Sequence, residues 1–138
     1  MILADTNVVS EFMRDTPAPA VFSWASTIAP GDLTMSVITV QEIEYGLRRL
    51  AHGRHRFALE ERWNQLVDSY GDMIATYDIE AARAAAEILV HAERAGHPMG
   101  LADVQIAGIC VARGYELATR NVRDFETVAN TITITNPF

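Results

Sequence analysis

The sequence predicts an α/β protein, a three-layer α/β/α sandwich on a mostly parallel five-stranded sheet. Short apolar runs of strand length alternate with longer segments whose apolar residues recur at helical spacing. Strands that are separated by helices pair in parallel through right-handed crossovers. The 138 residues contain no internal repeat and no low-complexity linker, so we expect one domain over 1–138.

The first half of the chain predicts two strands and three helices. Residues 1–4 are too few for a helix but suffice for a short buried strand, and the apolar positions from Val8 to Met13 recur at helical spacing. The stretch DTPAP ends that helix. The elements predicted next are a short helix at 21–28, a strand at 33–36 and a helix from about Thr39 to His52.

The second half predicts three helices and three strands. Helix 54–70 carries an apolar and aromatic stripe that we interpret as core, and Gly and Pro in GHPMG end the long alanine-rich helix that precedes them. In chain order, the predicted elements are a helix at 54–70, a strand at 73–77, helices at 79–95 and 102–113, and strands at 116–119 and 131–135.

Composition excludes several classes of function. A hydrophobic fraction of 49% with 21% charged residues is that of a globular protein, and no apolar run approaches the roughly 20 residues that span a bilayer. The net charge of −7 argues against a protein that coats nucleic acid through counterion release. All 11 basic residues are arginine, which excludes a P-loop and a Schiff-base lysine. The N-terminus resembles no secretory signal and the lone Cys110 reads as a buried hydrophobe, so we expect a cytoplasmic protein without membrane association.

Asp5 stands where the first strand becomes a helix. Aspartate is a favoured N-cap, because its side chain accepts from backbone N–H groups that the first helical turn leaves unpaired. Alternatively, Asp5 is one of several carboxylates at the carboxyl edge of a parallel sheet, where open α/β folds place their ligands. Further acids at the same edge would favour the second interpretation.

Glu42 follows the second predicted strand, in the stretch SVITVQEIEYGL. Thr39 and Glu42 fit the S/T-x-x-E capping box, which is a purely structural device. Glu42 nevertheless lies above the carboxyl end of a strand, as Asp5 does. We interpret the neighbouring Glu44 as a solvated side chain.

Asp103, in GLADVQIAGICVA, shares a helical stripe with Ile106, Ala107 and Cys110, so we expect it to face the protein. Its charged form is favoured near a helix N-terminus. Since burying an unpaired charge is costly, an inward carboxylate needs a partner. That partner is an arginine, a cap interaction or a divalent metal.

The stretch LATRNVRDFETV leaves the fourth predicted strand at Thr119 and turns through Asn121 and Asp124. Asp124 is either a metal ligand, direct or through water, or a stabiliser of this turn. Together with the three acids above, these residues gather at strand-to-helix junctions on one edge of the sheet. Mg²⁺ and Mn²⁺ prefer oxygen ligands, and such a site suits hydrolysis of phosphodiesters by metal-activated water.

Four blocks of the sequence resemble PIN-domain ribonucleases, in particular the VapC-type toxins of type II toxin–antitoxin systems. The blocks are DTNVVSE, SVITVQEIEYG, LADVQIA and ATRNVRDFE, which occur in the family's order and cover essentially the whole chain. The resemblance implies a PIN-like fold, a homodimer, and Mg²⁺- or Mn²⁺-dependent endoribonuclease activity on RNA. It also implies a cognate VapB-type antitoxin whose carboxy-terminal segment wraps the toxin.

Carried over residue by residue, the resemblance matches Asp5, Glu42 and Asp103 to catalytic, metal-binding positions. Thr6 and Asn7 match the polar pair after the first aspartate, and Thr119 and Asn121 are further supporting polar residues. Many relatives have an acid where this chain has Asn121, whereas others have Asn there and an acid at the position of Asp124. The resemblance therefore leaves open which residue completes the site, and whether one or two metals bind.

One basic cluster, RRLAHGRHR, interrupts this acidic chain. It is either a solvated helix end and turn, or a surface that contacts RNA phosphates or the antitoxin through Arg49, Arg54 and Arg56.

Two rival enzyme classes fit the sequence poorly. A haloacid-dehalogenase-type phosphatase needs an acid where this chain has Asn7, and both it and a response-regulator receiver need a lysine. The remaining alternative is a catalytically inactive PIN-like module that only binds a partner.

Overall fold

A parallel sheet of four strands lies at the centre of the computed structural model, which describes residues 1–138. The strands are β1 (Ile2–Ala4), β2 (Leu33–Thr34), β3 (Glu116–Ala118) and β4 (Ile134–Thr135), in the order β2-β1-β3-β4. β1 is central, with Ile2 opposite Leu33 on one side and opposite Glu116 on the other. Each crossover between strands contains helix, as the alternating pattern predicted.

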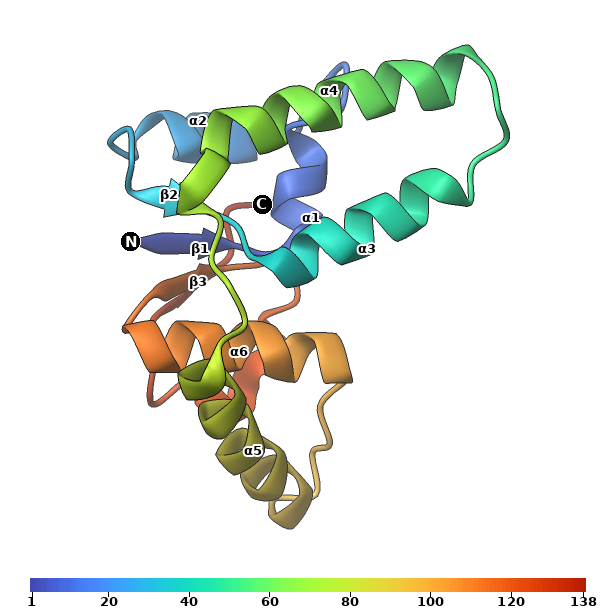
Figure 1. Cartoon of the computed structure of the whole chain (residues 1–138). Helices are drawn as coiled ribbons and strands as arrows, with labels where there is room; N and C mark the ends of the chain where they lie inside the picture. Colours follow the sequence, from blue (N-terminus) through green and yellow to red (C-terminus); the bar gives the residue numbers. More distant parts are fainter.

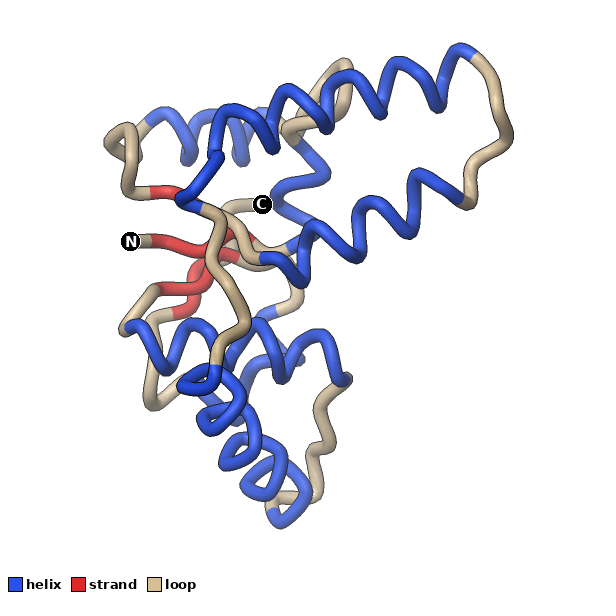
Figure 2. Tube along the Cα trace, viewed as in Figure 1, coloured by secondary structure: helices blue, strands red, loops and turns tan.

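Helices cover both faces of the sheet (Figures 1 and 2). The helices are α1 (Thr6–Glu11), α2 (Pro19–Ser26), α3 (Val37–Arg48), α4 (Arg54–Tyr70), α5 (Ile79–Arg94) and α6 (Leu101–Arg113), with 3₁₀ segments η1 (Gly71–Met73) and η2 (Val122–Val128). Leu3 and Leu117 face a core with α5, α6 and η2, whereas Ala4 and Ala118 face a second core with α1 to α4. Successive strand residues thus point to opposite layers, which confirms the predicted α/β/α sandwich. None of the helices is both long and apolar enough to cross a membrane.

The predicted third strand at 73–77 is wrong, so the sheet has four strands rather than five. Only Ala75 pairs, in a single parallel bridge to Ser36, with its N–H donating to the Met35 carbonyl at 2.9 Å. Met73 is the last residue of η1, and its backbone carbonyl accepts a hydrogen bond from the Thr34 hydroxyl at 2.7 Å. Because Asp78 already caps α5, too few extended residues remain for a longer ladder.

The predicted start of the third helix also needs correction. α3 begins at Val37, and its N-cap is Ser36, whose hydroxyl accepts from the Thr39 N–H at 3.3 Å. The Thr39–Glu42 capping box is therefore wrong, because both residues lie inside the helix. α3 also ends at Arg48, before the predicted His52.

α5 and α6 pack closely because Gly108 on α6 has no side chain at their contact. A Cβ atom at this position would lie 2.6 Å from the backbone carbonyl of Ala81 on α5. The contact fixes the helix whose first turn carries Asp103.

Candidate active site at the carboxyl end of the sheet

Asp5 lies directly after β1 and is 4% exposed. It caps α1, since its Oδ1 accepts from the Thr6 N–H at 2.8 Å. Its Oδ2 accepts from the Thr119 hydroxyl at 2.7 Å and from the Asn7 amide at 3.0 Å. The capping interpretation is therefore correct, but it uses only one of the two carboxylate oxygens.

Asn7 and Thr119 tie Asp5 to the chain that follows β3. The side-chain oxygen of Asn7 accepts from the Arg120 N–H at 3.0 Å, and the Thr119 hydroxyl accepts from the Asn121 N–H at 3.1 Å. These bonds link two segments more than a hundred residues apart in sequence. They leave the Asp5 carboxylate fixed in orientation.

Glu42 projects from the second turn of α3 and is exposed. The Thr6 hydroxyl donates to its Oε1 at 2.7 Å and lies 3.2 Å from the Thr39 hydroxyl. Thr6 therefore holds Glu42 at the N-terminus of α1, beside the residue that caps it. Figure 1 shows α1, α3 and the first turn of α6 at the side toward which the strand arrows point.

Asp103 lies in the first turn of α6 and is partly buried. Its side chain forms neither a hydrogen bond nor an ion pair, and α6 has Gly100 at its N-cap, so both structural alternatives fail. Burial, together with the charges of Asp5, Asp124 and Glu42, raises the pKa of Asp103 to about 6. The sequence prediction that these four acids share one site is consistent with this coupling.

Asp124 is exposed in η2, and its side chain makes no hydrogen bond. The turn is held instead by the backbone, where the Asp124 N–H donates to the Asn121 carbonyl at 3.0 Å. The interpretation of the Asp124 carboxylate as a stabiliser of this turn is therefore wrong. The Asn121 side chain forms no cap hydrogen bond either.

No arginine or histidine neutralises these four acids, since every ion pair of the chain lies elsewhere. Their oxygen donors match the preference of Mg²⁺ and Mn²⁺ in chemistry and charge. No three acidic, histidine or cysteine side chains stand close enough to ligate one ion as placed. The donor set fits a hard divalent cation, whereas the ligating geometry is not preformed.

The predicted basic surface lies apart from these acids, at the connection between α3 and α4 (Figure 1). Arg56 donates to the Leu50 carbonyl at 3.2 Å and pairs with Glu60, and Arg49 lies 5.4 Å from the ring centre of Tyr45. Arg49 follows Glu42 by seven positions, which corresponds to about 10 Å along the helix.

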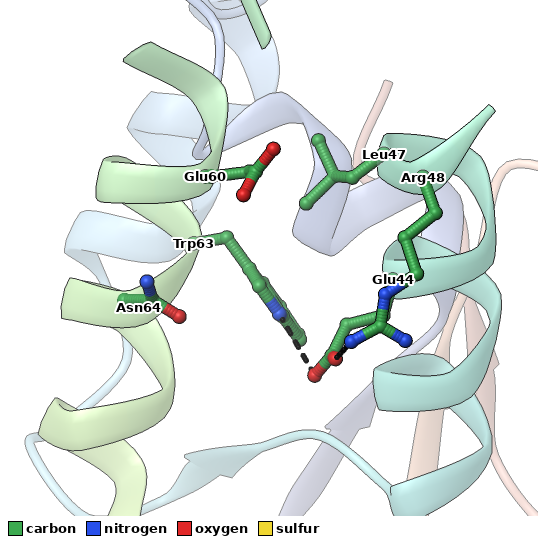
Figure 3. Close-up of a pocket in the computed structure, with 6 residues that line it drawn as sticks. All are labelled: Glu44, Leu47, Arg48, Glu60, Trp63 and Asn64. Carbon is green, nitrogen blue, oxygen red and sulfur yellow. Dashed lines mark hydrogen bonds and ion pairs between the residues drawn. The ribbon is translucent and has the colours of Figure 1, made fainter. Parts of the chain in front are cut away.

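Between α3 and α4 lies a separate cavity of about 240 Å³ (Figure 3). The Trp63 indole N–H donates to Glu44 at 3.3 Å, and Arg48 pairs with the same carboxylate at 3.3 Å. The interpretation of Glu44 as a merely solvated neighbour is therefore wrong. This carboxylate is neutralised within the protein, unlike those at the strand ends.

Sequence reasoning missed a second group beside the acids. A cavity of about 460 Å³ is lined by Thr6 and Glu42 at the acidic site and also by Glu11, Arg14 and Arg120. In the sequence, the i, i+3 spacing of Glu11 and Arg14 indicates an ion pair between these two residues. It does not indicate that Arg120 lies beside them.

Comparison with known proteins identifies the family. The model of the PIN domain matches residues 2–130. The VapC ribonuclease Y4jK of Sinorhizobium fredii is 32% identical over 139 residues, covering 100% of this chain and 98% of the relative. Toxin FitB of Neisseria gonorrhoeae is also 32% identical, covering 100% and 99%. The crystal structure of FitAcB from Neisseria gonorrhoeae matches with a TM-score of 0.90 at 31% identity, over 99% of this chain and 98% of that one.

The fold, the sequence blocks and these end-to-end similarities agree. The chain belongs to the PIN-domain family, among its VapC-type toxins.

Proposed function

We propose that this protein is a divalent-metal-dependent endoribonuclease toxin that a cognate VapB-type antitoxin neutralises. The observation that carries the proposal is Asp103, a partly buried carboxylate whose pKa is raised by burial and by three other acids and which has no cationic partner. A site that concentrates uncompensated negative charge is suited to an external cation. The relative named VapC ribonuclease supports RNA as the substrate.

In this proposal, Asp5 and Asp103 are the principal ligands of Mg²⁺ or Mn²⁺, and Glu42 is the third catalytic acid. Asp124 is the remaining ligand, with Asn121 beside it as a supporting polar residue. When bound, such an ion supplies an electrophile that neutralises phosphate charge and promotes ionisation of water.

The surrounding residues orient these carboxylates. Asn7 and Thr119 both donate to Oδ2 of Asp5 and fix its orientation. Thr6 donates to Glu42 and holds it beside α1. Fixed dipoles of this kind reduce the reorganisation that a reaction would otherwise require. Asp103 has no such donor, so its charge remains fully available to a cation.

We further propose a homodimer in the cytoplasm that binds its antitoxin through charge complementarity. The net charge of −7 favours a basic partner segment. The relative named Toxin FitB supports a neutralising partner for this chain as well. Mass measurement of the purified protein, alone and after expression with the neighbouring gene, tests both statements.

The decisive experiment incubates the purified protein with labelled structured RNAs and Mg²⁺ or Mn²⁺. We expect cleavage that stops with EDTA and is lost in Asp5→Asn and Asp103→Asn. Asp68→Asn is the matched control, because Asp68 is exposed on α4 and has no ion-pair or hydrogen-bond partner. Cleavage that survives in Asp103→Asn refutes the assignment, and antitoxin binding without cleavage of any RNA favours the inactive binding module.

A further inference from the structure

Arg14 and Arg120 converge on one buried acid beside the acidic site. Glu11 has a side chain that is 6% exposed, and its Oε1 lies 3.1 Å from Arg14 and 3.9 Å from Arg120. Its Oε2 accepts from the Ala18 N–H at 2.9 Å. One carboxylate thus faces two guanidinium groups, and the cluster keeps one net positive charge.

The Arg120 guanidinium is fixed in place but has no hydrogen-bond acceptor. It lies 3.8 Å from the ring centre of Phe138, and its backbone N–H is held by Asn7. The contact to Glu11 at 3.9 Å is too long for a hydrogen bond. The side chains of Arg14 and Arg120 remain 63% and 54% exposed, so both present free donors to solvent.

The position of this pair indicates its ligand. Both arginines line the same cavity as Thr6 and Glu42, and Asn7 connects the Arg120 backbone directly to Asp5. Guanidinium groups match phosphate oxygens in geometry and charge, and they are weakly hydrated. Because the pair shares a cavity with Glu42, an RNA strand with one phosphate at the acids can present a neighbouring phosphate to the two arginines.

We propose that Arg14 and Arg120 form a subsite for a backbone phosphate of single-stranded RNA adjacent to the one at the acids, with Phe138 positioning Arg120. The inference deepens the proposed function and rests on RNA as the substrate. Glu11 anchors the pair, and the net positive charge offsets the repulsion between RNA and the neighbouring carboxylates. The subsite sets the register of the strand; it takes no part in bond cleavage.

The test measures binding of a short fluorescein-labelled single-stranded RNA by fluorescence anisotropy over a range of salt, with Ca²⁺ replacing Mg²⁺ and RNA integrity checked on gels. We expect Arg14→Gln and Arg120→Gln each to weaken RNA binding about tenfold, because each variant loses one charge-assisted hydrogen bond to a phosphate. Each should also lower the salt slope by about 0.7, the value for one phosphate contact on a single strand. Arg83→Gln is the matched control, because Arg83 is exposed on α5 beneath the opposite face of the sheet.

Phe138→Leu tests positioning separately. It keeps apolar contact but removes the ring, so it should weaken RNA binding in the wild type and add nothing in Arg120→Gln. An equal effect in both backgrounds overturns the positioning role of the ring.

The subsite itself is overturned if the wild type does not bind RNA at low salt, or if the arginine variants match Arg83→Gln in affinity and slope. Loss of antitoxin binding with unchanged RNA binding also overturns it, because the pair then serves a carboxylate of the partner. Since no cleavage is measured, failure of the catalytic assignment of Asp103 leaves these results unaffected.

Discussion

Replacing Asp103 with Asn should stabilise the metal-free protein at neutral and alkaline pH. Burial and three neighbouring acids raise the pKa of Asp103 from 3.8 to about 6. A carboxyl group whose pKa is higher in the folded state destabilises the fold once it ionises. The penalty is absent well below pH 3.8, grows as pH rises between the two pKa values, and is complete above about pH 6.

The size of the effect follows from the shift. At 1.36 kcal/mol per pH unit, a change from 3.8 to about 6 corresponds to about 3 kcal/mol as an upper limit. Asp103 is only partly buried, so water screens these charges and we reduce the expected value to about 1–2 kcal/mol. Asparagine keeps the shape of the side chain and removes the charge.

Urea unfolding in EDTA measures this difference across pH. The free energy of unfolding of Asp103→Asn should exceed that of the wild type near pH 8, and the gap should close toward pH 4. Asp68→Asn, on an exposed part of α4, should show no such pH dependence. A variant that is less stable than the wild type near pH 8 would refute the claim that Asp103 is an uncompensated charge.

Three further predictions concern the residues around the site. Thr119→Val removes the donor to Asp5 and should lower the free energy of unfolding by about 1–2 kcal/mol and reduce RNA cleavage, measured in parallel. Gly108→Ala would meet an α5 carbonyl at 2.6 Å and should cost about 1–3 kcal/mol in urea unfolding, whereas Gly46→Ala has open space and should be neutral or stabilising. Glu11→Gln should lower the free energy of unfolding at neutral pH, because hydrogen bonds from the Ala18 N–H and Arg14 lower the pKa of Glu11. The loss should become smaller as the pH falls below 4.5. A free energy of unfolding that is unchanged at neutral and at acidic pH would contradict this.

The sequence could suggest a shared acidic site because the positions of the acids relative to strands and helices are local features. Asp5 directly follows β1, Glu42 lies in the second turn of the helix after β2, and Asp103 lies in the first turn of α6; parallel strands bring such junctions to one edge. The cap of α3 was harder to predict, because Ser36 and Thr39 both suit an N-cap and only the pairing of Ser36 with Ala75 separates them.

Other features depend on tertiary contacts that no local pattern encodes. Residues 73–77 are of types that suit a strand. The Thr34 hydroxyl, however, donates to the Met73 carbonyl, and the segment pairs with the sheet only through the bridge between Ala75 and Ser36. The approach of Arg120 to Glu11 joins residues from opposite ends of the chain. It depends on how the segment after β3 docks on α1 through Asn7.

Glu11 and Asp103 are two inward acids that the chain treats in opposite ways. Glu11 receives a backbone N–H and two arginines, and these contacts lower its pKa. Asp103 receives no donor, lies among three acids and has a raised pKa. Glu11 thus has its partners within the protein, whereas Asp103 has none, which supports the cation site proposed above. In EDTA at neutral or alkaline pH, Glu11→Gln and Asp103→Asn should consequently change stability with opposite signs.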